Sequence, residues 1–242
     1  MKKFSLLFSL LFIAASVQVF AQKKKGNGNI ITQERSIPSF KSLKVSGSFN
    51  VQMISSMEGK LSISTDENLL ESIITEVKDD VLIIRNKNKH YLKTSRSKPI
   101  IIKVPLADVN NVKLSGSGKI HADSAIIVDD FKASSAGSGK INLSVKATSI
   151  SAQLAGSGKI ILKGSTTSIK AKHAGSGSIR LQGIEAKNGE VSLAGSGSVY
   201  VRCSDSLNVS VAGSGSVRYF GEPKEKLHTK VAGSGSVRLA IE

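Results

Sequence analysis

The sequence predicts an all-β fold, a single-stranded parallel β-helix flattened into two sheets, from three observations. The tripeptide Gly-Ser-Gly occurs seven times in the C-terminal half, at intervals of 18 to 21 residues. Apolar and polar side chains alternate on both sides of each copy. Aromatic residues make up only 5% of the chain and tryptophan is absent, so small and β-branched residues are expected to form the core. A fixed period near 20 residues is typical of a solenoid, whose repeats pack only on their neighbours.

The alternation gives each repeat the form of a strand, a sharp corner and a second strand. In SISAQLAGSGKIILKG, the apolar and glycine residues fall on every second position from Ile150 to Leu162. A period of two indicates strands with one buried face, and the phase continues through both glycines. The two strands of a repeat should each pair in parallel with the next repeat, about 4.8 Å away along the axis.

Glycine is expected at the corners for two reasons. An inward Cβ would strike the neighbouring repeat, and glycine reaches positive φ without steric cost. The serine between the glycines should point outward, in a stacked column with a structural rather than a catalytic role. The glycines assigned to these turns are Gly116, Gly118, Gly137, Gly139, Gly156, Gly158, Gly175, Gly177, Gly195, Gly197, Gly213, Gly215, Gly233 and Gly235.

Four segments are predicted along the chain. Residues 1–21 have the charge pattern and apolar run of a Sec-type signal peptide, although the run is also at the short edge for an uncleaved membrane anchor. Residues 22–29 (QKKKGNGN) are expected to be a flexible tether. Residues 30–109 form a β-rich N-terminal part and residues 110–242 the repeat solenoid. The expected location is the periplasm, the outer membrane or the cell surface and beyond.

The N-terminal part lacks the tripeptide but still predicts strands. The segment ITEVKDDVLIIRN is typical of a hairpin that turns at Asp79 and Asp80, and PIIIKVP predicts another strand. ENLLES is expected to be a single helical turn. This part should continue the solenoid irregularly and cap it, whereas the last strand, VRLAIE, has no evident cap and leaves a sheet edge open.

The chain is strongly basic, with 34 Lys and Arg against 18 Asp and Glu. Removal of Lys2 and Lys3 with the signal peptide would leave a net charge of +14. Such a charge favours contact with anionic surfaces, or simply keeps a protein soluble and monomeric. The expected partner is an anionic glycan or an envelope protein, with a homo-oligomer through the C-terminal sheet edge as a further possibility, and nucleic acid is not expected.

No catalytic, metal or cofactor site is predicted. The four histidines follow no metal-ligand spacing, and the single cysteine excludes an internal disulfide. His173 takes an inward position that leucine fills in neighbouring repeats, so we expect a hydrogen-bonded core histidine. Cys203 also falls on the inward phase, which indicates a buried structural thiol.

Two basic features are the candidate sites for an anionic ligand. The first is a stripe of outward residues beside the corners, which stacking of the repeats should align: Lys119, Lys140, Lys159, Arg180, Tyr200, Arg218 and Arg238. The second is the acid-free segment from Arg85 to Lys98, whose cations are Arg85, Lys87, Lys89, Lys93, Arg96 and Lys98. Each feature is also compatible with a solvated surface, and most cation-rich loops are simply solvated.

Several segments resemble a known family. The repeated Gly-Ser-Gly-[Lys/Ser]-[Ile/Val], the stretch SFNVQMISSMEGKLSISTDENLL and the stretch GEPKEKLHTKVAGSGSV are similar to the autotransporter adhesin head domain (GIN domain) family. The similarity extends over about residues 38–239. It implies a pectin-lyase-like β-helix, no catalytic residues to transfer, and a role in adhesion.

Three functions therefore compete. The leading one is a non-enzymatic secreted or envelope protein that presents a basic solenoid face to anionic glycans or proteins. The second is a β-helix polysaccharide lyase or hydrolase, which would need acids, or a base with arginine, clustered where the repeat is broken. The third is a structural envelope module that self-associates through the open sheet edge.

Overall fold

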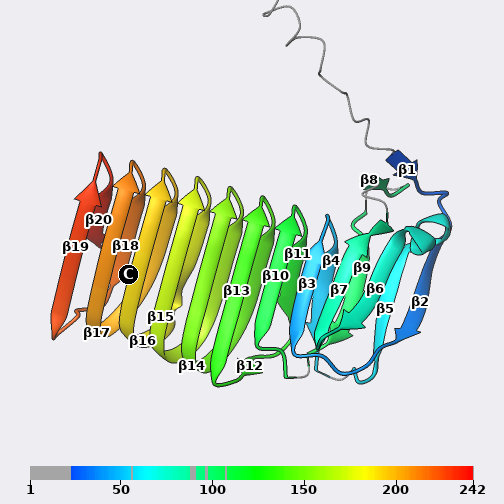
Figure 1. Cartoon of the computed structure of the whole chain (residues 1–242), viewed down its shortest axis with the longest axis horizontal. Coiled ribbons are helices and arrows are strands. Elements are labelled where there is room, and N and C mark those ends of the chain that lie inside the picture. The colour runs from blue at the N-terminus through cyan, green and yellow to red at the C-terminus, as the bar shows by residue number, and fades with distance from the viewer. Residues whose placement is uncertain (1–22, 56, 88–90, 96–97, 107, 242) are drawn as a thin grey trace, which may run out of the picture.

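The computed structural model describes residues 23–55, 57–87, 91–95, 98–106 and 108–241, and it shows an elongated solenoid of parallel strands (Figure 1). The predicted signal peptide lies outside the described residues. The described strands are β1 (Lys23–Lys25), β2 (Ile30–Ser36), β3 (Ser42–Ser46), β4 (Asn50–Ile54), β5 (Lys60–Asp66), β6 (Ile73–Lys78), β7 (Val81–Asn86), β8 (Tyr91–Lys93), β9 (Ile101–Pro105), β10 (Asn111–Gly116), β11 (Lys119–Ala122), β12 (Ile126–Ile127), β13 (Asp130–Gly137), β14 (Lys140–Gly156), β15 (Lys159–Gly175), β16 (Ser178–Gly195), β17 (Ser198–Gly213), β18 (Ser216–Phe220), β19 (Lys226–Ala232) and β20 (Ser236–Leu239). The 3-10 helix η1 (Glu67–Ser72) follows β5.

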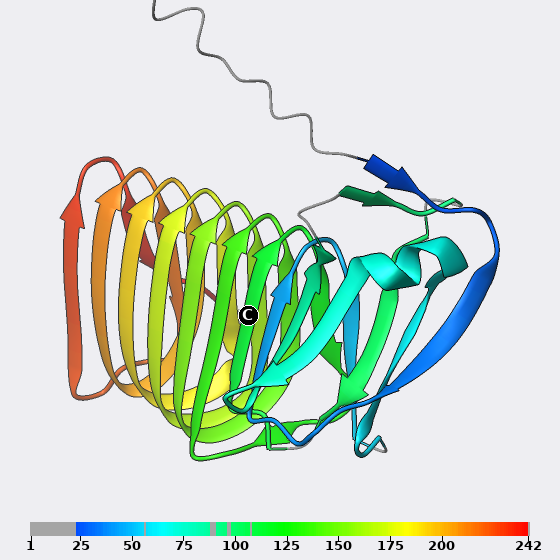
Figure 2. The same ribbon diagram turned by 45° about the vertical axis from the view of Figure 1, so that its right-hand side comes forward.

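The predicted β-solenoid is confirmed, and its two faces are joined more continuously than expected. Strands β14 to β17 are 16 to 18 residues long and bend round the end opposite the corners, so that one strand serves both faces (Figure 2). We call one such turn of the chain a coil. Face A carries the residues that precede each corner, including β10 and β13. Face B carries the residues that follow it, including β11 and β18.

The Gly-Ser-Gly corners stack in exact register, as the repeat predicted. The first glycine of each has a φ between 112° and 125°. At the corner of Gly156, the N–H groups of Ser157 and Gly158 donate to the carbonyl of Gly137 in the preceding coil, at 3.0 and 2.9 Å. A Cβ on Gly156 would lie 2.7 Å from that same oxygen. The first glycine is therefore required both by its φ and by the close approach of two backbones.

The variation in repeat length is absorbed at the end of the coil opposite the corners. The pairing of β15 with β16 shifts register between Ile161 and Lys163, and that of β16 with β17 shifts between Leu181 and Asn188. Both strands regain register before the next corner. Extra residues therefore never displace the corners or the side chains beside them.

The N-terminal part contributes two coils, so the solenoid extends beyond the expected boundary at residue 110. Strands β3 and β4 pair in parallel with β10 and β11, and Gly47, with a φ of 136°, is the corner between them. Strands β7 and β9 form the coil beyond, because β7 pairs with β3 and β9 with β4. The spatial order of these coils therefore differs from their order along the chain.

Antiparallel strands close the N-terminal end. Strand β6 pairs with β7 through the expected hairpin, in which Asp79 and Asp80 have φ values of 49° and 58°. Strand β5 pairs with β9, and β2 with β5. The expected helical turn is η1, whose Leu69 and Leu70 are buried. These elements occupy the sheet edges at this end of the solenoid.

The C-terminal end is open. Strand β19 pairs with β17, every residue of it is exposed, and no described strand pairs with its other edge. Leu227 and Val231, which continue columns of core residues, are 44% and 42% exposed. Self-association through this edge stays a prediction. Within the described residues, no helix has the length and apolar character needed to cross a membrane.

Candidate functional site

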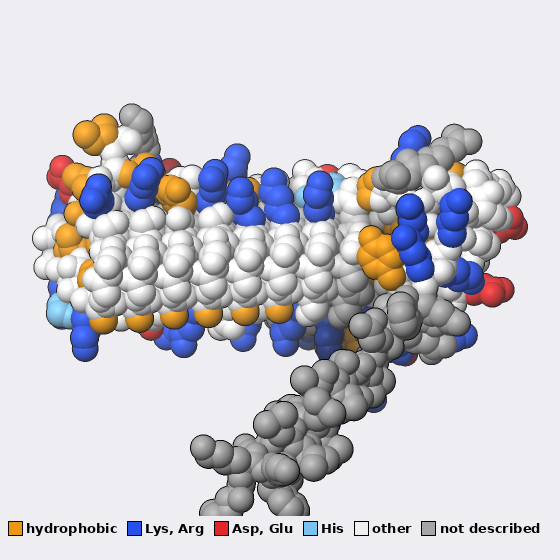
Figure 3. Space-filling model, turned by 90° about the horizontal axis from the view of Figure 1, so that it is seen from above, with side chains coloured by type: hydrophobic (Ala, Val, Ile, Leu, Met, Phe, Trp, Pro, Cys, Tyr) orange, Lys and Arg blue, Asp and Glu red, His pale blue; other side chains and the backbone are white. Residues whose placement is uncertain are grey.

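The first lysines of the predicted stripe stand in one column on face B. Register pairs Lys119 with Lys140 and Lys140 with Lys159. Lys119 and Lys140 are exposed and Lys159 is half-buried. Seen from above, a row of basic side chains borders the flat surface formed by the corners (Figure 3).

The remaining residues of the stripe stand two positions further from the corner and form a second column. Register aligns Arg180 with Tyr200, Tyr200 with Arg218 and Arg218 with Arg238. The guanidinium carbons of Arg180 and Arg218 lie 5.3 and 5.9 Å from the centroid of the Tyr200 ring. The ring is therefore held between two arginines, and we call these four residues the arginine ladder.

Tyr200 reduces the electrostatic repulsion between Arg180 and Arg218 by separating them. Arginines in adjacent coils would stand about 4.8 Å apart and repel by about 0.9 kcal/mol in water, but at two coils the repulsion falls to about 0.4 kcal/mol. Each cation–π contact contributes about 0.5–1 kcal/mol at an exposed site. The two contacts with Tyr200 therefore outweigh the repulsion between Arg180 and Arg218, and they fix the positions of both guanidinium groups.

Two residues beside the ladder were missed in the sequence. The guanidinium carbon of Arg202 lies 5.8 Å from the ring centroid of Phe220, its register partner in the next coil. The Nε of Arg202 also donates to the carbonyl of Gln182 at 3.2 Å. The outward phase that selected Tyr200 continues two residues further to Arg202, so the signal was present. Face B thus carries arginine and aromatic side chains over four coils, from β16 to β20.

The described cations of segment 85–98 lie in different places. Arg85 lies on β7, which belongs to face A. It forms an ion pair with Glu76, with 3.3 Å between Nη2 and Oε1. Lys87 is exposed. Lys93 and Lys98 line a cavity of about 430 Å³. Lys89 and Arg96 lie outside the described residues.

The same cavity contains a residue that the sequence placed in a tether. Lys23 belongs to β1, which pairs in parallel with β8, so the segment expected to be flexible carries a short strand. The Lys23 Nζ lies 6.0 Å from the centroid of the Tyr91 ring. Lys23, Tyr91, Lys93 and Lys98 line the cavity together, and we call it the lysine cavity.

Asp66 fixes the chain around this cavity. Its carboxylate is fully buried and accepts hydrogen bonds from the N–H groups of Gly28 at 2.8 Å and Ser95 at 3.1 Å. Burial acts to raise the pKa of Asp66, but the hydrogen bonds from Ser95 and Gly28 outweigh it, and the pKa is lowered from its ordinary value. An ionised Asp66 therefore ties the segment after β1 to the segment after β8.

The pKa shift predicts how this tie responds to acid. Because the folded-state pKa of Asp66 lies below the ordinary 3.8, the carboxylate stabilises the fold above that pH, and this contribution is lost as the pH falls through the folded-state pKa. The D66N variant should be about 1–3 kcal/mol less stable than the parent protein at pH 7. We expect the two free energies of unfolding to converge in denaturant titrations at successively lower pH. A difference that stays constant into the acid range would contradict this role.

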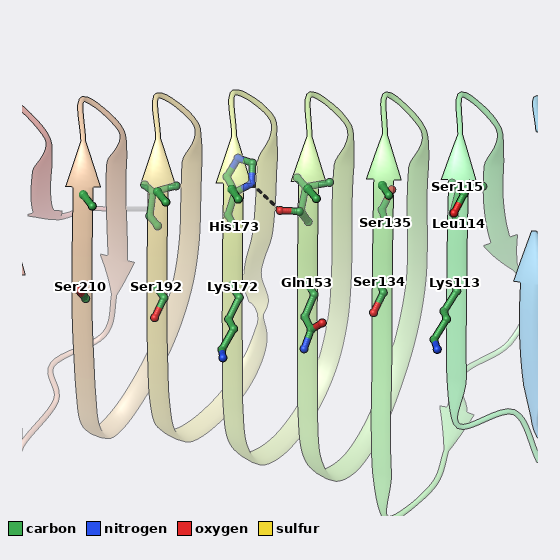
Figure 4. A pocket seen from close by; sticks show the side chains of 17 residues that line it. Lys113, Leu114, Ser115, Ser134, Ser135, Gln153, Lys172, His173, Ser192 and Ser210 are labelled. Carbon is green, nitrogen blue, oxygen red and sulfur yellow. Dashed lines mark hydrogen bonds between the residues drawn. The ribbon is translucent and has the colours of Figure 1, made fainter. Parts of the chain in front are cut away.

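The remaining candidate groups are structural. His173 is 2% exposed, and its ring nitrogens lie 3.1 Å from the carbonyl oxygen of Leu154 and 2.9 Å from that of Gly177, which confirms the hydrogen-bonded core histidine (Figure 4). Cys203 is buried, and burial, with the charge of Asp205, raises the pKa of its thiol to about 11. Its thiolate is therefore scarce at neutral pH. In the described part of the chain, no cluster of three or more His, Cys, Asp and Glu side chains could hold a metal ion.

Face A has a shallow groove of about 530 Å³ (Figure 4). A column of alanines beside the corners forms its floor, and polar side chains such as Lys113, Gln153 and Lys172 stand along one side. The groove is open to solvent and follows the repeat without interruption. It offers a regular surface rather than a specific pocket.

The chain belongs to the family described as putative auto-transporter adhesin, head GIN domain, whose model matches residues 39–223. No curated protein gives a match. A putative adhesin from Bacteroides fragilis is 22% identical with a TM-score of 0.81, and the alignment covers 90% of this chain and 100% of that one. A putative lipid binding protein from Parabacteroides distasonis is 26% identical with a TM-score of 0.76, over 91% of this chain and 100% of that one. A putative adhesin from Parabacteroides merdae is 23% identical with a TM-score of 0.74, with coverage of 91% and 100%.

Proposed function

We propose that this protein is an exported, non-enzymatic adhesin that holds an anionic polysaccharide along face B of its solenoid. The observation that carries the proposal is the arginine ladder, in which Tyr200 separates and orients Arg180 and Arg218. The family description supports a role in adhesion rather than catalysis.

The ladder has the chemistry that a polymer of acidic sugars requires. Arginine binds carboxylate and sulfate through two parallel hydrogen bonds, and the phenolic hydroxyl of tyrosine can donate a hydrogen bond to a sugar hydroxyl or accept one from it. The described ion pairs, Lys60–Glu34, Arg85–Glu76 and Lys170–Glu190, involve no ladder residue. Because the repeat sets the spacing of these groups, a ligand with its own repeat can contact several of them at once.

Neither a glycosidase nor a lipid-binding role is supported as strongly as this proposal. A glycosidase uses a pair of carboxyl groups, whereas the described ladder residues and their aromatic neighbours offer cations and rings. Lipid binding, named for the Parabacteroides distasonis protein, would need an apolar cavity, and the groove on face A is one candidate. That groove is shallow and open to solvent along its length, whereas lipid and drug-sized ligands are usually enclosed on most sides.

The test compares two triple variants with the same loss of charge. R180S/R218S/R238S removes the cations of the ladder, and K113S/K132S/K172S removes three exposed lysines from face A. Binding to heparin and to polygalacturonate would be measured by calorimetry at fixed salt, with circular dichroism to verify the fold. We expect the ladder variant to lose at least about tenfold in affinity, or ~1.4 kcal/mol, and the control variant to lose far less. Equal losses in the two variants would assign binding to overall charge and refute the proposal.

A further inference from the structure

The corner pattern is broken in two adjacent coils, and the lysine cavity lies between the two breaks. In the coil of β3 and β4, Phe49 stands where the other corners have their second glycine. In the coil of β7 and β9, the sequence between the two strands has no Gly-Ser-Gly and includes β8. The cavity is bounded by Ser48, Phe49 and Ile100 on the solenoid side and by Tyr91 and its neighbours on the side of β8. Irregular segments on a rigid scaffold are where binding sites concentrate.

The described cations of the cavity have no acidic partner. None of the described ion pairs includes Lys23, Lys93 or Lys98, and no Asp or Glu is among the described residues that line the cavity. Asp66 is turned to the N–H groups of Gly28 and Ser95 instead. Tyr91 is 56% exposed. The cavity therefore combines unneutralised positive charge with an accessible aromatic surface.

Hydrogen bonds order the backbone that carries these cations, although the cations come from distant parts of the chain. Strands β1 and β8 bring Lys23 opposite Tyr91 (Figure 1). The N–H of Gly26 donates to the carbonyl of Lys93 at 2.8 Å, and the hydroxyl of Thr94 donates to the carbonyl of Lys98 at 2.6 Å. Such prior ordering lowers the entropic cost of binding a ligand.

We propose that the lysine cavity binds the phosphate group of a phosphorylated sugar, with Lys23, Lys93 and Lys98 around the phosphate and the sugar ring against Tyr91. Three compact ammonium charges suit a compact phosphate dianion, whereas planar carboxylates are better matched by the arginine fork. The volume of about 430 Å³ lies in the range of pockets for small ligands. A soluble sugar phosphate and the phosphorylated headgroup of an envelope glycolipid share this chemistry.

The test uses calorimetry on the chain without residues 1–21, with glucose 6-phosphate, inorganic phosphate and glucose as probes. We expect glucose 6-phosphate to bind more tightly than either of the other two. The K23S/K93S/K98S variant should lose at least tenfold in affinity for it, and Y91A should reduce the preference for glucose 6-phosphate over inorganic phosphate. R180S/R218S/R238S, with the same charge loss, should bind glucose 6-phosphate within twofold of the parent protein, whatever it does to polysaccharide binding.

Three results would overturn the proposal: no saturable binding of glucose 6-phosphate, equal affinity for inorganic phosphate, or equal losses in the two triple variants. Vesicles that carry lipid A, with phosphatidylcholine vesicles as the control, distinguish the sources of the ligand. Lysine-dependent binding at lower concentrations of lipid A than of glucose 6-phosphate assigns the headgroup, and the reverse order assigns the soluble sugar.

Discussion

Replacement of Gly156 by alanine is expected to destabilise the protein by about 3–5 kcal/mol, because two costs arise at one corner. A non-glycine residue forced into a sparsely populated backbone region costs about 1–3 kcal/mol, and Gly156 has a φ of 113°. The new Cβ would also lie 2.7 Å from the carbonyl oxygen of Gly137. Moving the coils apart would weaken the hydrogen bonds that Ser157 and Gly158 donate to that oxygen, each worth about 1 kcal/mol.

Ser157→Ala supplies the matched control at the same corner. Ser157 is exposed and its side chain points away from the stack, so the change should alter stability by no more than about 0.5 kcal/mol. Guanidinium denaturation followed by circular dichroism measures both. Similar losses for G156A and S157A would show that the corners tolerate a Cβ and that the repeat has another cause.

The position of the corner along the axis should also matter. The stability of a solenoid is approximately a sum over coils and the interfaces between them. Gly156 lies in the middle, so a strained interface there separates two blocks of coils. Gly233 faces the same clash, with a Cβ 2.6 Å from the oxygen of Gly213, but only the last coil lies beyond it. Its replacement should therefore fray that coil and leave the others folded.

The repeat and its alternation were sufficient to predict most of the architecture, because each coil repeats a local pattern. The hairpin at Asp79 and Asp80 and the helical turn of η1 were also predictable, because each depends on a short local stretch of sequence. The corner at Gly47 was missed, because Phe49 replaces the second glycine and hides the tripeptide. The placement of β7 and β9 outside β3 and β4 depends on pairing between distant segments, which no local period records.

The candidate site was predictable where it follows the repeat and hidden where it does not. Outward phase alone aligned Arg180, Tyr200 and Arg218, since corners in register carry their neighbours with them. The stacking of the guanidinium groups on the ring depends on side-chain conformation and could not be predicted. Lys23 was assigned to a tether, because three lysines followed by glycine and asparagine carry no strand signal, and only pairing with β8 orders them.

Replacement of Phe49 by alanine should be the most damaging single change at the junction between the solenoid and its cap. Phe49 is 1% exposed and among the largest fully buried side chains. Its ring lies so close to Gly47 that a Cβ there would be 2.9 Å from the ring, and its carbonyl accepts the N–H of Lys119 at 2.8 Å. Truncation of a buried phenylalanine to alanine typically costs about 3–5 kcal/mol.

The loss should be local in a way that hydrogen exchange can resolve. Because Phe49 is buried at the corner between β3 and β4, next to the coil of β7 and β9, exchange in F49A should accelerate most in these four strands and least in β15 and β16. Phe220→Ala is the control: Phe220 is half-buried on face B, and its removal costs mainly the contact with Arg202, about 0.5–1 kcal/mol. Equal losses in the two variants, or uniform acceleration in F49A, would mean that Phe49 does not couple the cap to the solenoid. A larger and localised loss would show that the ring of Phe49 joins adjacent coils at this divergent corner, as close backbone contact joins them at the other corners.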